Sequence, residues 1–151
     1  MPQHSHYRID LPRKTYSSKP TAVVVTPSSP KSNRNHVERF ARYLLREMHY
    51  GGIQFEAVEQ PTSIGYVPYR AYLFSAEDRY VGAACFRFKP DHCPQTPWLF
   101  DWVWLHPYFR RQGHLAALWP DLTPQFGQFR LSKPISPAMQ NFLLKHGHKA
   151  V

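Results

Sequence analysis

The sequence predicts an α+β fold of the α/β-sandwich type, in which helices flank a sheet. The chain has 151 residues, which is enough for one domain. Its hydrophobic content of 42% and aromatic content of 15% are sufficient for a buried core. Segments with strand and helix periodicity follow one another in the order strand, helix, strands, helix, strand, helix, without an internal repeat.

The first part of the chain is predicted to be a basic arm ahead of the main domain. Residues 1–20 are polar and basic and contain serine and proline, which is typical of an extended arm. The β-branched stretch TAVVVT (21–26) predicts a short strand, and PSSPKSNRN (27–35) predicts a loop. The predicted units are therefore an arm at 1–35 and a domain at 36–151.

The clearest helix opens this domain. Asn35 is a suitable N-cap and Glu38 follows three residues later, as in a capping box, while Gly51-Gly52 is expected to end the helix. Core packing explains its apolar stripe completely, so no function is assigned to it. The stripe has helical spacing and consists of Val37, Phe40, Ala41, Leu44, Leu45 and Met48.

The middle of the chain is rich in strands. Residues 53–59 predict a strand or a strand-like connection. YRAYLFSA (69–76) and YVGAACFRF (80–88) are separated by a tight turn and predict an antiparallel hairpin. After a loop at 89–97, WLFDWVWL (98–105) predicts the most buried strand.

The last third predicts a helix, a strand and a second helix. The first helix covers 114–119, with 122 as its furthest end, because Pro120 and Pro124 interrupt the pattern. QFRLS (128–132) predicts a strand. The final helix is expected at 136–147, and its boundary residues are an N-cap Ser136, Pro137 at the first helical position and Gly147 at the end.

The net charge of +9 is located at the two ends of the sequence. Residues 1–35 carry six Lys or Arg and one Asp, and so do residues 110–151, whereas the middle is nearly neutral. This distribution favours a polyanionic ligand near the C-terminal half. Nucleic acid held by the basic arm is a competing explanation, although no known nucleic-acid-binding signature is present.

Other classes of site have little support. Cys85 lies in an apolar strand, and Cys93 has no partner cysteines at metal-ligand spacing, so no metal is expected. No apolar run reaches the length of a membrane span, and the N-terminus has no apolar signal region. We therefore expect a cytoplasmic protein without membrane contact.

The turn after the most buried strand has the features of a phosphate-binding site. His106-Pro107 ends the strand, Arg110-Arg111 supply positive charge, and Gly113 permits close backbone approach just before a helix. The amides at a helix N-terminus are unpaired and carry partial positive charge. Such an arrangement can hold a pyrophosphate, although two arginines in a solvated loop are also common.

The segment VWLHPYFRRQGHLAALW (103–119) resembles the acyl-CoA-binding segment of the GNAT N-acyltransferase superfamily. The family pattern is an apolar strand, x-P-x-x-R, and then [QR]-x-x-G-x-[GA] leading into a helix. Arg110 takes the first position and Gly113 the glycine, whereas Leu115 stands where Gly or Ala is usual. The resemblance covers roughly residues 69–147. A looser similarity of 126–147 is to the cohesin-acetyltransferase-like subgroup.

The resemblance implies a mixed, mainly antiparallel sheet flanked by helices and transfer of an acetyl group from acetyl-CoA to a primary amine. The acceptor, a protein lysine or a small molecule, is not identified by the sequence. Residues implied in cofactor binding are Val103, Trp104 and Leu105 for the pantetheine, Arg110, Arg111, Gln112, Gly113, His114, Leu115 and Ala116 for the diphosphate, and Asn141 for the cofactor arm.

Asp101 is the candidate catalytic base, because it is the only acid in an apolar strand and alternation places it with Val103 and Leu105 on one face. The alternative is that Asp101 caps a loop or pairs with an arginine such as Arg87. Ser132 is a second candidate, as a hydrogen-bond donor to the thiol sulfur. Ser136 is also near that position, although it is expected to serve as a helix N-cap.

Two departures from the family leave non-catalytic functions open. The chain stops soon after the last helix, so we expect the final strand pair of a full GNAT fold to be missing or supplied differently, and no tyrosine follows Tyr108 to protonate a departing thiolate. The alternatives are therefore a non-catalytic GNAT-like protein that binds CoA or a partner, and a basic nucleic-acid-binding module.

Overall fold

The computed structural model describes residues 9–13, 22–91, 93–132 and 136–146 of the chain. Its centre is a five-stranded sheet in which the strands lie in sequence order. All neighbours are antiparallel except the last two, which are parallel. The strands are β1 (Val23–Val25), β2 (Tyr69–Ala76), β3 (Arg79–Phe88), β4 (Trp98–Leu105) and β5 (Arg130–Leu131).

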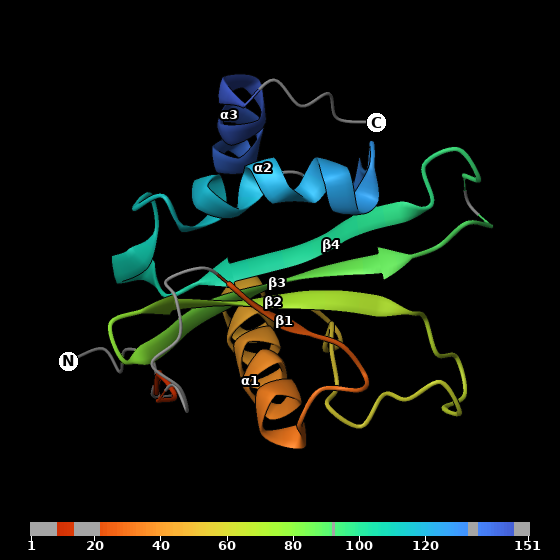
Figure 1. Cartoon of the computed structure of the whole chain (residues 1–151). Helices are drawn as coiled ribbons and strands as arrows, with labels where there is room; N and C mark the ends of the chain where they lie inside the picture. Colours follow the sequence, from red (N-terminus) through yellow and green to blue (C-terminus); the bar gives the residue numbers. More distant parts are fainter. Residues whose placement is uncertain (1–8, 14–21, 92, 133–135, 147–151) are drawn as a thin grey trace.

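Helices cover both faces of the sheet (Figure 1). Helix α1 (Lys31–Met48) packs on one face and α2 (His114–Phe126) on the other, and α3 (Pro137–Lys145) lies against α2. Each interface has its own buried aromatic cluster. The prediction of a mixed, mainly antiparallel sheet flanked by helices is therefore confirmed.

Helix α1 begins earlier than predicted, at Lys31, and the predicted N-cap Asn35 lies inside it. Pro30 is the N-cap residue, with a φ of −53° and a non-helical ψ of 144°, and its carbonyl accepts the first helical hydrogen bonds from the Asn33 and Arg34 amides at 3.0 and 3.2 Å. Glu38 does not form a capping box but accepts a hydrogen bond from the Ala57 amide at 2.8 Å. The helix ends at His49 in a left-handed conformation, before the predicted glycine pair.

Two other predicted elements differ in the structure. Residues 53–59 form turns and not a strand; Phe55 and Ala57 are buried there, and side chains of α1 bind the Ala57 backbone. Helix α2 continues to Phe126, through Pro120 and Pro124. Burial of Leu122 and Phe126 offsets part of the cost of the two exposed prolines, which is roughly 3 kcal/mol each.

The bounds of most remaining elements agree with the prediction, but β4 is not the most buried strand. β3 is buried at every position except its two ends, whereas buried and half-buried residues alternate along β4. β2, β4 and the Ser136 N-cap of α3 lie at their predicted positions, whereas β5 is shorter than the predicted 128–132. Gly147 lies outside the described residues. The predicted domain boundary at 35/36 falls within α1, and β1 pairs with β2 in the one sheet.

The described part of the predicted arm is attached to the domain. The Tyr43 hydroxyl accepts a hydrogen bond from the Asp10 amide at 2.9 Å and donates one to the Asp10 carbonyl at 3.2 Å. The Tyr80 amide donates to the Pro12 carbonyl at 2.9 Å, and Leu11 contacts both aromatic clusters. Residues 9–13 thus cover the start of β3.

Candidate active site

Asp101 lies at an irregularity of β4. The register between β3 and β4 shifts so that Cys85 pairs with Trp102 while Phe86 pairs with Phe100, and Asp101 is the extra residue. A bulge of this kind turns side chains of neighbouring residues out of strict alternation. The prediction that Asp101 shares a face with Val103 is therefore wrong: Val103 packs toward α2, whereas Asp101 faces Arg87.

The Asp101 carboxylate is mostly buried and has two polar neighbours. The Arg87 Nε atom lies 3.7 Å from Asp101 Oδ2, so the alternative reading of an Arg87 pair is seen in the structure. Burial raises the pKa of Asp101 above its ordinary value, and this effect outweighs the opposing charges of Arg87 and Lys89 and a hydrogen bond from Ser132. The structure thus brings Asp101 and Ser132 together, in a place that favours proton uptake by Asp101.

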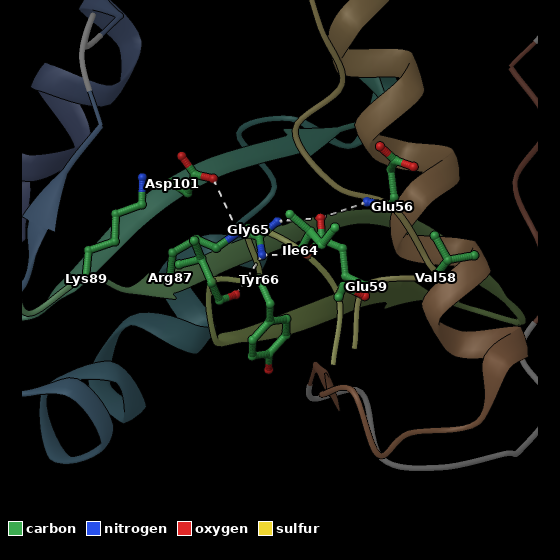
Figure 2. Close-up of a pocket in the computed structure, with 11 residues that line it drawn as sticks. Glu56, Val58, Glu59, Ile64, Gly65, Tyr66, Arg87, Lys89 and Asp101 are labelled. Atoms are coloured by element: carbon green, nitrogen blue, oxygen red, sulfur yellow. Dashed lines mark hydrogen bonds and ion pairs between the residues drawn. The ribbon is translucent and has the colours of Figure 1, made fainter. Parts of the chain in front are cut away.

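A pocket of about 400 Å³ lies in front of Asp101. Its floor comes from β3 and β4, and its wall is the segment after α1 (Figure 2). This volume is in the range of small-molecule sites. The lining residues are Glu56, Val58, Glu59, Ser63, Ile64, Gly65, Tyr66, Val67, Arg87, Lys89 and Asp101.

Arg87 connects the wall of the pocket to its floor. Its Nη atoms donate to both carboxylate oxygens of Glu59, at 2.7 and 3.2 Å. They also donate to the backbone carbonyls of Val67 and Gln54 at 3.0 Å. The guanidinium side chain is only 7% exposed, so this network fixes the wall segment against β3.

The basic turn follows β4 and leads into α2. A short 3₁₀ helix, η1 (Pro107–Phe109), is followed by Arg111 with a φ of 62° and Gly113 with a φ of 86°. The Ala117 amide donates to the Gly113 carbonyl at 2.9 Å. The three preceding amides, those of His114, Leu115 and Ala116, lie ahead of this first helical bond and are geometrically suited to an anion.

The two arginines of the turn have different positions. Arg110 Nε donates to the Leu105 carbonyl at 2.7 Å, Arg110 Nη2 lies 2.6 Å from a Glu47 oxygen of α1, and the guanidinium covers Trp104. Arg111 is exposed. Of the predicted pair, Arg110 therefore ties the turn to α1, and Arg111 is the arginine open to a ligand.

Other predicted cofactor residues are distributed around this turn. The Gln112 side chain donates to the Tyr108 carbonyl. Leu115 is 8% exposed and packs into the α2-side cluster, so its side chain points to the core. His114 packs its ring against Phe109. Asn141 is exposed on α3, and no described contact joins it to the turn.

The last part of β4 has a partner on one side only within the described residues. β5 pairs with Leu99 and Phe100, and the ladder ends with the Ser132 amide donating to the Phe100 carbonyl at 3.0 Å. Beyond that point, the described backbone of Val103 to Leu105 pairs with β3 alone. The Leu105 carbonyl accepts a hydrogen bond from Arg110 Nε, so the other backbone groups of this edge are the ones open to an extended ligand.

Three partly buried histidines predict a pH-dependent stability. Burial lowers the pKa of His36, His106 and His114 below 6.5, with Arg39 adding to the shift of His36 and Arg110 to that of His106. Below about pH 6.5 the unfolded chain binds more protons than the folded one, so stability present above that pH is lost as the pH falls. We expect a lower Tm at pH 5.5 than at pH 7.5 in thermal unfolding. A His36→Gln variant should reduce this difference, and an equal Tm at both values contradicts the argument.

Sequence reasoning did not find the pocket wall. Segment 50–68 has no periodic pattern. The sequence favours core packing for Tyr66, Tyr69 and Tyr72, with the lining of an acceptor cleft as the alternative. Tyr66 lines the pocket, whereas Tyr69 and Tyr72 are buried in the two opposite clusters. The sequence feature that could have indicated this wall is the pair of acids Glu56 and Glu59 near the apolar residues Val58 and Ile64.

Neither a protein-family profile nor a curated protein matches the chain. Five solved chains match its structure. One is a ribosomal-protein-alanine N-acetyltransferase from Brucella melitensis biovar Abortus 2308, with a TM-score of 0.54, 16% identity, and coverage of 87% of this chain and 93% of that one. The chain has a GNAT-like α+β fold. At this identity the likeness concerns the fold, and the subgroup similarity stays a prediction.

The GNAT-like chain holds no group of three or more metal-ligating side chains among its described residues. Cys93 accepts a hydrogen bond from the Thr96 hydroxyl, and Cys85 is buried. None of the helices in the described part of the chain has the length and apolarity that a membrane crossing requires.

Proposed function

We propose that the chain is an acetyl-CoA-dependent N-acetyltransferase that acts on a primary amine. The observation that carries this proposal is the position of two features on one strand. The buried carboxylate of Asp101 and its pocket lie at the bulge of β4, and the amide-rich turn follows the end of the same strand. Leu105 is the fourth residue after Asp101, which corresponds to about 13 Å along a strand.

In the proposed arrangement, the diphosphate of acetyl-CoA binds the amides of 111–116 with Arg111 beside it. The pantetheine runs along the free edge of Val103 to Leu105 and brings the thioester near the bulge. The amine enters through the pocket in front of Asp101. Val58 and Ile64, which are largely exposed at the pocket, offer apolar contact to the rest of the acceptor.

The chemistry proposed is direct transfer. The amine nitrogen attacks the thioester carbon, a C–N bond forms, and the C–S bond breaks to release the CoA thiolate. Asp101 accepts the proton that the nitrogen loses. Solvent water supplies the proton that the thiolate takes. The Ser132 hydroxyl donates its one hydrogen to Asp101, so it must rotate away from Asp101 to donate to the sulfur. Partial burial of Asp101 suits this role, because it keeps the carboxylate a stronger base than an exposed one.

Calorimetric titration with acetyl-CoA and CoA tests the binding half of this proposal. The wild type is expected to bind with a micromolar Kd. Arg111→Glu with Gly113→Asp should weaken binding by about 100-fold or more, because it reverses one charge and places a carboxylate at the anion site. The matched control is Arg39→Glu with Gly127→Asp, which reverses one exposed charge on α1 and places a carboxylate at another exposed glycine with positive φ. Absence of binding by the wild type contradicts the proposal.

A non-catalytic CoA-binding protein is the second candidate. The ion pair between Arg87 and Asp101 favours it, because a paired carboxylate is a weaker base, and so does the lack of a tyrosine after Tyr108. Binding of acetyl-CoA without transfer to any amine would support this candidate. Salt-dependent binding of RNA or DNA that survives loss of Arg110 and Arg111 would instead support the nucleic-acid alternative.

A further inference from the structure

Glu59 and Asp101 face the same arginine from two sides of the pocket. Glu59 belongs to the wall segment and Asp101 to β4, and Arg87 of β3 lies between them (Figure 2). One cation therefore meets two carboxylates. The distance from the Arg87 guanidinium to each carboxylate decides how strongly its positive charge stabilises that carboxylate.

In the structure, Arg87 lies closer to Glu59 than to Asp101. Glu59 receives a two-point ion pair, with both of its oxygens within hydrogen-bond distance of the Arg87 Nη atoms. Asp101 receives only the Arg87 Nε atom at 3.7 Å, which is beyond hydrogen-bond distance. Because the carbonyls of Val67 and Gln54 occupy further donors, Arg87 is held toward the wall and away from Asp101.

We propose that Glu59 is a positioning residue for Asp101: it holds the Arg87 guanidinium and so prevents a short ion pair between Arg87 and Asp101. A two-point Arg–carboxylate pair has fixed geometry and is the stronger competitor. In the absence of Glu59, Asp101 is the nearest carboxylate left to Arg87. The Asp101 carboxylate would then be occupied by the guanidinium and would no longer be open to the amine of a substrate.

The other groups around Asp101 do not substitute for Glu59. Lys89 contributes positive charge to the pocket, and Ser132 donates a hydrogen bond to Asp101. Both stabilise the charged carboxylate and act in the same direction as Arg87. Cys85 is a buried thiol next to these groups, and burial raises its pKa to about 12, so it stays neutral. Glu59 thus acts against Arg87 and Lys89, which lower the pKa of Asp101, because its negative charge raises that pKa.

The test compares Glu59→Gln with Glu56→Gln. Both acids line the pocket on the same segment, but only Glu59 contacts Arg87. In Glu59→Gln, the side-chain shape is kept and the negative charge is lost. The pKa of Asp101 is expected to fall by about 1–2 units, as is typical for a carboxylate that gains a close arginine. NMR titration of carboxyl-labelled aspartate, assigned with Asp101→Asn, measures this pKa without any turnover.

Since the role of Asp101 as base rests on the proposed function, transfer is measured separately. We expect kcat of Glu59→Gln at pH 7 to fall about tenfold and the acid limb of its pH profile to move to lower pH, because a weaker base accepts the proton less readily. The Kd for acetyl-CoA should stay at the wild-type value, since the turn is untouched. Asp121→Asn, at an exposed acid of α2 outside the pocket, should match the wild type, and Glu59→Asp, which keeps the charge, should recover part of the loss.

The outcomes separate the two proposals. An unchanged or raised Asp101 pKa in folded Glu59→Gln overturns the positioning role, whatever the activity. An equal fall in Glu56→Gln also overturns it, because the effect would then be one of pocket charge and not of Arg87 placement. If the wild type transfers no acetyl group, the proposed function fails, while the titration still decides whether Glu59 holds Arg87 away from Asp101.

Discussion

Replacement of Asp101 by asparagine is expected to lower the rate of acetyl transfer by about 10²–10⁴-fold, the usual contribution of a general base. Asparagine keeps the shape of the side chain and its contact with Ser132, but it cannot accept a proton from the attacking amine. Since the turn is untouched, binding of acetyl-CoA should not change. Steady-state rates with a panel of primary amines and calorimetry on the same variant measure both quantities.

The pH dependence of this variant adds a second readout. At high pH the acceptor amine is already neutral and hydroxide can remove the proton, so the difference from the wild type should become smaller. Asp121→Asn is the control, because Asp121 is an exposed acid on α2, away from the pocket. Wild-type transfer by Asp101→Asn at pH 7 contradicts the assigned base.

Replacement of Gly82 by alanine is expected to destabilise the fold by about 3 kcal/mol, the upper range for overpacking. Gly82 lies in β3 opposite Leu105 of β4. A Cβ atom at this position would lie 2.3 Å from the Trp104 carbonyl oxygen and 2.8 Å from the Leu105 Cα atom. Because both contacts are with backbone, no side-chain rotation relieves them, and the two strands must separate.

Chemical denaturation measures this loss, and Gly52→Ala is the matched control. A Cβ at Gly52 meets no atom within 4 Å, so that variant should be neutral or slightly more stable. The strand separation in Gly82→Ala should also weaken acetyl-CoA binding, because the His106 amide donates to the Val81 carbonyl beside the turn. Wild-type stability of Gly82→Ala would show that the strands adapt.

The elements that the sequence predicted best are those whose local pattern agrees with their packing. β2 and β4 are mainly apolar strands at their predicted bounds, and the Ser136 side chain accepts a hydrogen bond from the Met139 amide as an N-cap. The prolines of α2 misled the prediction, because the burial of Leu118 and Trp119 on the sheet was invisible in the local pattern. In α2, tertiary packing therefore overrides the low intrinsic helix propensity of proline.

Only the part of the candidate site that is contiguous in sequence could be predicted. The turn from Arg110 to Gly113 is a contiguous motif, so its position after a strand and before a helix could be read directly. The pocket in front of Asp101 depends on a β-bulge and on Arg87 reaching Glu59 across 28 residues of sequence. Alternation arguments assume a regular strand, and they place Asp101 on the wrong face once one extra residue is inserted.

The attachment of Arg110 to Glu47 has a consequence for how the turn would respond to ionic strength. With Arg110 engaged by α1, the turn presents one exposed arginine and a set of backbone amides. Salt screens exposed side-chain charges over a Debye length of about 8 Å at physiological concentration. Amides fixed at the start of α2 act through short, directed hydrogen bonds that dissolved ions compete with poorly. A polyanion bound mainly by this backbone would therefore be retained at salt concentrations that release ligands from purely ionic patches.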